Sequence, residues 1–162
     1  MINIKLSRVD YRLMHGQVVT GWLNHVSADT IIIVNDELAV DQFLSQVFLM
    51  AAPPGIQVVI LSINDSIAYL NEKENQNKKY LVLFKTIGDA YKAVIAGFPI
   101  NNLQIGGVDN APGKRKIGDV LSVSDDEIIM LKELVEKGVD VLFQVTTKHS
   151  SLTLESVLRS LE

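Results

Sequence analysis

One short segment near the N-terminus gathers side chains that together suit phosphoryl transfer. Residues 7–16, SRVDYRLMHG, contain two arginines, one aspartate and one histidine. A neutral imidazole is a competent nucleophile toward phosphorus, and the positive potential of two arginines favours the neutral ring of His15. The planar guanidinium of Arg8 or Arg12 offers a fork of N–H donors that suits phosphoryl oxygens. The segment therefore predicts that His15 carries a phosphoryl group.

Two neighbours of His15 have supporting parts in this prediction. Asp10 is expected to orient either the imidazole ring or one of the arginines. Gly16 allows a close backbone approach or an unusual backbone conformation, and a helix that begins near His15 would point its unpaired N–H groups into the same space. Phosphoryl transfer depends mainly on positioning and on stabilising charge. We expect this cluster to supply both.

The spacing alone leaves other interpretations of these residues open. A histidine near a helix start is often a cap or a surface residue, and the arginines and aspartate of a loop can simply pair with each other. An anion-binding site without chemistry is a further hypothesis. A histidine phosphatase or mutase is disfavoured, because those enzymes have arginine directly beside the histidine, whereas two residues separate Arg12 from His15.

The composition is that of one globular domain and excludes several classes of protein. The chain has 162 residues, of which 48% are apolar and 21% charged, with a formal net charge of -4. This length is enough to bury a sizeable core, and an acidic chain with few aromatic residues is not expected to bind nucleic acid. There are no cysteines, which excludes disulfides, thiolate metal sites and thiol catalysis and fits a reducing cytoplasm.

The sequence predicts neither a membrane span nor a cofactor. The longest apolar stretch, Val47–Leu61, is too short to cross a bilayer and is interrupted by Pro-Pro-Gly at residues 53–55, and the N-terminus lacks a secretory signal. There is no P-loop and no Gly-rich dinucleotide motif. Because His25 and His149 lack acidic or histidine neighbours at ligand spacing, we expect no metal site.

Short β-branched runs alternate with helical patterns along the chain. The predicted strands are Ile2–Leu6, Thr30–Val34, Gln57–Leu61, Tyr80–Phe84, Leu103–Ile105 and Val139–Val145. The predicted helices are Gln17–His25, Glu37–Ala52, Asp65–Glu72, one capped by Thr86 and ending at Gly97, Asp125–Lys137 and Ser151–Leu161. Ser124 and Glu127 predict a capping box at the start of Asp125–Lys137, and Gly138 predicts its end. This alternation predicts an α/β fold with three layers, α/β/α, around a mainly parallel central sheet. Such folds bind ligands beyond the carboxyl ends of the strands.

Several polar residues follow the other predicted strands. Lys85 would add a cation to a pocket at that edge of the sheet, unless it is simply solvated. Gly106-Gly107 permits close backbone approach but is a weak signal by itself. The basic run at residues 114–116 is typical of a solvated loop, although it would also suit an acidic partner. Asn35 and Asp36 are expected to serve as helix caps.

The segment around His15 also resembles the signature of a known family. Residues 8–22, RVDYRLMHGQVVTGW, are similar to the IIB component of the mannose/fructose/sorbose family of the bacterial phosphoenolpyruvate-dependent sugar phosphotransferase system. Further matches stand in the expected order at Val34–Glu37, Ala52–Gly55, Leu83–Thr86 and Ile105–Gly107. The resemblance covers essentially the whole chain and implies a single IIB domain, residues 1–162.

The resemblance implies a specific reaction, that of a protein-phosphohistidine–sugar phosphotransferase. His15 would accept a phosphoryl group, on Nδ1, from the phosphohistidine of a IIA component. It would then pass the group to a sugar held by the membrane IIC and IID components. Arg8, Asp10 and Arg12 correspond to the charged residues of the family's active-site loop.

The remaining expectations concern the surroundings of His15. We expect Gly16, Gln17 and Lys85 to contact the phosphate, and no cofactor or metal to take part. The protein would be cytoplasmic and transiently at the inner face of the cell membrane, with homo-oligomer formation left open and the sugar unidentified. Val9, Leu13 and Met14 are candidate contacts for partners, although Leu13 is expected to pack inward.

Overall fold

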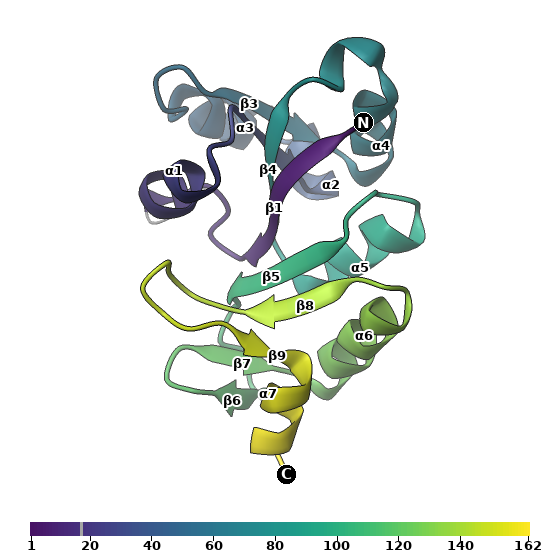
Figure 1. Ribbon diagram of the computed structural model, residues 1–162. Coiled ribbons are helices and arrows are strands. Elements are labelled where there is room, and N and C mark those ends of the chain that lie inside the picture. Colours follow the sequence, from purple (N-terminus) through teal and green to yellow (C-terminus); the bar gives the residue numbers. More distant parts are fainter. Residues whose placement is uncertain (17) are drawn as a thin grey trace.

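A mostly parallel sheet of seven strands forms the centre of the computed structural model, which describes residues 1–16 and 18–162 (Figure 1). The strands are β1 (Asn3–Asp10), β2 (Thr30–Val34), β3 (Gln57–Leu61), β4 (Lys79–Phe84), β5 (Asn102–Gly107), β8 (Asp140–Phe143) and β9 (Leu152–Thr153). Their order across the sheet is β3-β2-β4-β1-β5-β8-β9, and β9 pairs antiparallel to β8. The predicted fold class is confirmed, and β1 lies centrally, between β4 and β5.

Helices cover both faces of this sheet and complete the three layers. The helical segments are η1 (Val18–Trp22, a π-helical turn), α1 (Leu23–Val26), α2 (Asp36–Val40), α3 (Gln42–Met50), α4 (Ile63–Asn71), η2 (Lys73–Asn75), α5 (Ile87–Ile95), α6 (Asp125–Glu136) and α7 (Leu154–Ser160). The apolar residues of α4, α5, α6 and α7 join one core cluster. Those of η1, α1 and α2 join a second cluster.

The central strands are buried on both faces, as their unbroken apolar runs predict. All five residues of β2 are buried, and successive side chains alternate between the two clusters, with Ile32 in one and Ile31 and Ile33 in the other. The buried sheet therefore supports the loops that follow the carboxyl ends of its strands.

The predicted helix boundaries at Thr86, Ser124 and Gly138 are confirmed. The side chain of Thr86 accepts a hydrogen bond from the Asp89 N–H at the start of α5. Ser124 and Glu127 form the reciprocal capping box of α6. Gly138 follows α6 with φ of +91°, a conformation that glycine adopts without steric cost.

The structure differs from the predicted elements at several places, including residues 152 and 153, which form a strand instead of the start of the last helix. β1 continues to Asp10, four residues beyond the predicted end, because its residues pair on both sides with β4 and β5. The predicted helix Glu37–Ala52 is divided into α2 and α3, because Asp41 leaves the helical conformation and caps α3 with its side chain. The predicted strand Val139–Val145 ends at Phe143, so residues 144 and 145 lie in the following loop.

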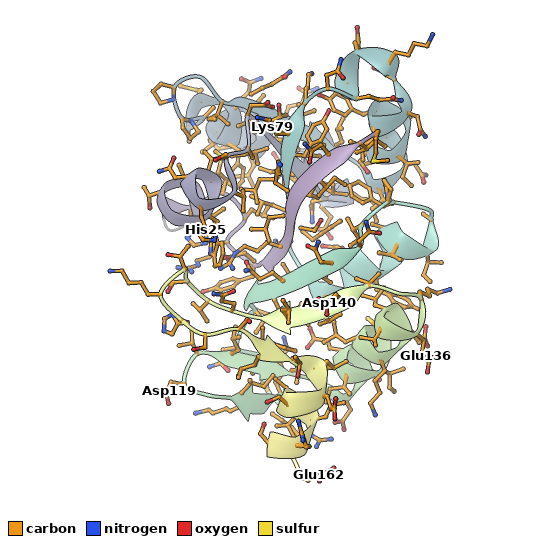
Figure 2. All side chains as sticks on the ribbon, in the orientation of Figure 1. His25, Lys79, Asp119, Glu136, Asp140 and Glu162 are labelled. Carbon is orange, nitrogen blue, oxygen red and sulfur yellow. The ribbon has the colours of Figure 1, made fainter. Side chains whose placement is uncertain are left out.

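Short elements that periodicity does not reveal complete the fold. A hairpin of β6 (Arg115–Ile117) and β7 (Leu121–Val123) follows β5, and β9 precedes the last helix. In Figure 2, His25 of α1 and Asp119 in the turn of this hairpin both lie on the left side, where the arrows of β5 and β8 end. Within the described ranges, no helix has the length and apolar character needed to cross a membrane.

Candidate active site

The carboxyl end of β1 carries a buried ion pair. Arg8 and Asp10 are two residues apart on a strand and so point to the same face. Nη2 of Arg8 lies 3.3 Å from Oδ2 of Asp10, and both side chains are fully buried. Burial lowers the pKa of the Arg8 guanidinium from its ordinary value, and contact with Asp10 counteracts part of this change. The hypothesis that these residues pair with each other is therefore confirmed for Arg8.

Arg8 connects β1 to the segment that follows β8. Its Nη1 donates to the side chain of Gln104 and, over 2.9 Å, to the backbone oxygen of Gln144. Its Nη2 donates to the backbone oxygen of Val145 over 2.8 Å. The Arg8 guanidinium also lies 5.3 Å from the ring centroid of Trp22, within the range of a cation–π interaction. With both terminal nitrogens bonded to protein acceptors, Arg8 is not placed to hold phosphoryl oxygens directly.

Two glycines on β5 make room for the ion pair. A Cβ atom on Gly106 would lie 1.9 Å from the Arg8 guanidinium carbon, and one on Gly107 would lie 2.7 Å from Oδ1 of Asp10. Neither distance is sterically possible, so any larger residue would displace the charged groups. The Gly-Gly pair of the sequence thus lets β1 and β5 approach each other with two charged side chains between them.

Asp10 extends from this buried pair to His15. Oδ2 of Asp10 lies 2.7 Å from Nε2 of His15, and the histidine side chain keeps 16% of its surface exposed. Among residues 1–16 and 18–162, Nδ1 of His15 has no hydrogen-bond partner. The Val19 N–H donates to the His15 backbone oxygen over 3.0 Å, so the helical segment begins immediately after the histidine, as predicted.

Arg12 lies in a very different environment from Arg8. Its side chain is 47% exposed, and its Nε is 3.7 Å from Oδ1 of Asp10. The guanidinium lies 5.6 Å from the ring centroid of Tyr11. Tyr11 and Arg12 both line two pockets, of about 340 and 280 Å³, on the surface beside the loop. Arg12 is therefore a cation that an incoming anion can reach.

The loop between Asp10 and His15 is a tight turn whose apolar residues point inward. The Leu13 N–H donates to the Asp10 backbone oxygen over 2.9 Å, and Leu13 has φ of +56°, which costs a non-glycine residue about 1–2 kcal/mol. The left-handed conformation thus falls at Leu13 rather than at Gly16. Leu13 is buried, as predicted. Val9 and Met14 are buried as well, so the hypothesis that these two residues contact partners is wrong.

The residues proposed to contact phosphate are only partly brought together. Lys85 is exposed after β4 and lines the 280 Å³ pocket together with Arg12. Gly16 is exposed, and a Cβ atom there would meet nothing within 4 Å. Gln17, for which phosphate contact was also predicted, lies outside the described residues. In the basic run, Lys114 pairs with Asp109 and Glu127, and Arg115 pairs with Asp125, whereas Lys116 lines the 340 Å³ pocket.

Sequence reasoning missed the residues that support Arg8. Gln104 and the backbone oxygens of Gln144 and Val145 are acceptors for its guanidinium. Nε1 of Trp22 donates to the same Val145 oxygen over 3.3 Å. Main-chain acceptors cannot be identified from residue types, because every residue has a backbone oxygen. The one indication in the sequence was Gly106-Gly107, since two small residues on β5 leave space for large side chains of β1.

The chain matches a known protein family over nearly its whole length. The family model described as the phosphotransferase system sorbose subfamily IIB component matches residues 4–162. A sorbose-specific EIIB component from Lacticaseibacillus casei is 37% identical over 148 residues, which cover 91% of this chain and 90% of that protein. The crystal structure of manxB from Thermoanaerobacter tengcongensis superposes with a TM-score of 0.90 and 36% identity, covering 98% of this chain and 96% of the other.

A longer relative shows the same domain beside another one. The mannose-specific EIIAB component of Escherichia coli K12 is 26% identical over 159 residues, which are 98% of this chain and 49% of that protein. The match of the family model over nearly the whole chain, together with the L. casei relative, carries the assignment. This protein belongs to the sorbose subfamily of IIB components of the bacterial sugar phosphotransferase system.

Proposed function

We propose that the protein is a phosphocarrier, which accepts a phosphoryl group from a IIA component on Nδ1 of His15 and passes it to a sugar. The observation that carries this proposal is the contact between Asp10 and Nε2 of His15. A carboxylate can only accept a hydrogen bond, so the ring proton belongs on Nε2 and the lone pair on Nδ1. The nucleophilic nitrogen is then Nδ1, which has no hydrogen-bond partner among the described residues 1–16 and 18–162.

In the first step, the Nδ1 lone pair attacks the phosphorus of a phosphohistidine on the donor. The bond between the donor nitrogen and phosphorus breaks as the new bond to His15 forms. Asp10 stabilises the positive charge that develops on the ring through the N–H at Nε2. The buried Arg8 holds Asp10 in place, and therefore acts on the reaction as a positioning residue and not by contact with phosphate.

Arg12 is the residue that we assign to the phosphoryl oxygens. Its side chain is half-exposed beside His15, and its guanidinium makes a long contact of 3.7 Å with Asp10 and a contact with the Tyr11 ring. Lys85 supplies a second cation on the same pocket. Gly16 is exposed and has open space beside its Cα, which supports our assignment of its backbone to the phosphoryl oxygens. These groups stabilise transferring charge, which is the main requirement of phosphoryl transfer.

In the second step, a sugar hydroxyl attacks the phosphorus of phospho-His15. The bond from Nδ1 to phosphorus breaks, and the hydroxyl proton passes to a base on the membrane IIC or IID component that holds the sugar. Residues 1–162 act as one IIB domain in this scheme, in the cytoplasm, and at the membrane during this step. No cofactor takes part in either step.

Label transfer tests the proposal. Phosphorylated IIA with labelled phosphate is mixed with the wild-type protein, with His15→Ala and with His25→Ala, which changes an exposed histidine of α1. We expect an acid-labile phosphoprotein with the wild type and with His25→Ala, and no label on His15→Ala. Label on the His15→Ala variant would disprove the assignment. Release of free phosphate would indicate a phosphatase, and neither label nor release would indicate a binding domain.

A further inference from the structure

The helix α3 exposes an apolar surface that the fold does not cover. No residue of α3 is buried. Side-chain exposure is 80% for Phe43, 47% for Val47 and 85% for Met50, and Val40 at the end of α2 is 81% exposed. Together with Leu44 these residues form what we call the α3 surface. Clusters of large exposed apolar side chains on a folded domain mark interaction sites.

The spacing within α3 suits contact with another helix or loop. Phe43, Val47 and Met50 stand at positions i, i+4 and i+7, which places them on one stripe of the helix. Stripes of this kind are normally buried against a neighbour. In this structure the inward contacts of α3 are with α2 and with β3, the edge strand of the sheet (Figure 1), and they leave the stripe outside.

The α3 surface adjoins the candidate active site through Leu44. The 280 Å³ pocket is lined on one side by Tyr11, Arg12 and Leu13 and on the other by Leu38, Leu44 and Phe48. A macromolecule that places a reacting group beside Arg12 therefore reaches the first turns of α3. This proximity favours a partner in the reaction over an unrelated protein.

The charged residues next to the α3 surface along the chain are all negative, whereas the basic Arg12 and Lys85 line the 280 Å³ pocket that Leu44 also lines. Between residues 36 and 56 the charged residues are Asp36, Glu37 and Asp41, with no lysine or arginine. A second copy of this chain would bring the same acidic residues, and an anionic lipid surface would be repelled by them. The cytoplasmic loops of membrane proteins carry an excess of lysine and arginine. Their charge complements the acidic margin of the α3 surface.

We propose that the α3 surface docks on the basic cytoplasmic face of the membrane component that holds the sugar. This inference rests on the proposed function, since it concerns the second of the two transfer steps. The apolar stripe supplies buried area next to Arg12, and Asp36, Glu37 and Asp41 meet the lysines and arginines of the membrane partner. Docking of the IIA donor does not depend on Phe43 or Met50.

The two half-reactions test this assignment separately. The double variant Phe43→Ser/Met50→Ser removes two exposed side chains and is compared with Ile129→Ser, whose side chain on α6 is 55% exposed. We expect both variants to accept label from phosphorylated IIA within about twofold of the wild-type rate. With vesicles containing the IIC and IID components and their sugar, the double variant should need at least tenfold more protein for half-maximal transfer, whereas Ile129→Ser should behave as wild type.

A second variant tests the charge argument. Glu37→Gln removes one exposed acidic group beside the α3 surface. We expect a two- to fivefold rise in the protein concentration needed for half-maximal transfer to sugar. This rise should shrink at high salt, where exposed charges are screened.

Each other outcome overturns the proposal. An equal loss of rate in transfer from IIA and in transfer to the sugar would show that the α3 surface binds the IIA donor. No loss in either transfer would show that the α3 surface has no role in the reaction. A wild-type dimer that the double variant converts to a monomer, with transfer unchanged, assigns the surface to a second copy. If the wild-type protein takes no label on His15, the proposed function itself fails. This outcome differs from failure of the docking proposal, because it is seen without any variant.

Discussion

Two arginines four residues apart, Arg8 and Arg12, lie in opposite environments. Arg8, on β1, is fully buried and pairs with Asp10, whereas Arg12, in the following loop, has 47% of its side chain exposed. The strand fixes the first because its side chain points between β1 and β5, where Gly106 and Gly107 leave space for it. The loop leaves the second free beside two pockets. Identical residue types thus lie in two environments, and we propose that the buried Arg8 positions Asp10 and that the exposed Arg12 contacts phosphate.

The largest effect is expected from Arg8→Ala. The substitution removes the fully buried cationic partner of Asp10, and breaking a buried ion pair in this way costs about 3–5 kcal/mol of unfolding free energy. Denaturant unfolding measures this loss directly. Any folded fraction should also accept label slowly, because Asp10 no longer orients His15. A stability equal to that of the wild type would show that the buried contacts of Arg8 contribute nothing.

Arg12→Ala should give the reverse result. Its unfolding free energy should stay within about 0.5 kcal/mol of the wild type, as for most exposed sites. The rate of single-turnover transfer from phosphorylated IIA should fall about 10²- to 10³-fold, the usual effect of removing one electrostatic stabiliser. If instead Arg12→Ala loses stability while its transfer rate is unchanged, the division of roles between the two arginines is wrong.

Gly107→Ala tests whether the space between β1 and β5 sets the position of Asp10. The new Cβ would lie 2.7 Å from Oδ1 of Asp10, and relief of such overpacking costs about 1–3 kcal/mol. We expect lower stability together with slower phosphorylation of His15. The control is Gly88→Ala on α5, whose Cβ would make an ordinary contact at 3.6 Å with Thr86. Equal behaviour of the two variants would contradict the steric argument.

The smallest effect on stability is expected at the ion pair of Asp109 and Lys114. Its carboxylate is exposed, unlike that of the buried pair of Arg8 and Asp10. The hydrogen bond from Lys114 lowers the pKa of Asp109 below its ordinary value. The ionised carboxylate therefore adds stability above its unfolded-state pKa, and this contribution disappears as the pH falls through the folded-state value. Because Asp109 is 65% exposed, Asp109→Asn should cost less than about 1 kcal/mol at pH 7 and still less at pH 2. Unfolding curves at both pH values measure this difference.

The contrast between Arg8 and Arg12 also shows how much of the structure can be predicted from the sequence. The alternation of apolar runs and caps at Thr86 and Ser124 predicted the layers and the sheet, because these signals depend on local periodicity and on local hydrogen bonds. The end of β1 was placed too early, since a charged residue such as Arg8 is rarely buried. Its burial depends on acceptors from residues 104, 144 and 145, which are distant in the chain and partly main-chain atoms.

For the candidate site, the sequence predicted which residues lie together more completely than it predicted their contacts. His15, Asp10 and Arg12 lie together, as the spacing and the resemblance indicated. The sequence left open whether Asp10 orients the ring or an arginine, and the structure shows contacts with both, through Nε2 of His15 and Nη2 of Arg8. The exposure of the apolar stripe on α3 was likewise beyond prediction, because helical spacing of apolar residues does not say which stripe a fold covers.

The central claim is that the contact of Asp10 with Nε2 leaves Nδ1 of His15 to carry the phosphoryl group. Phosphorus and nitrogen NMR of the phosphorylated protein, labelled with ¹⁵N in its histidines, identifies the ring nitrogen bonded to phosphorus. We predict phosphorylation of a single histidine at Nδ1, with the Nε2–H retained and its signal shifted in Asp10→Asn. Phosphorus on Nε2, or on a histidine other than His15, would contradict the account.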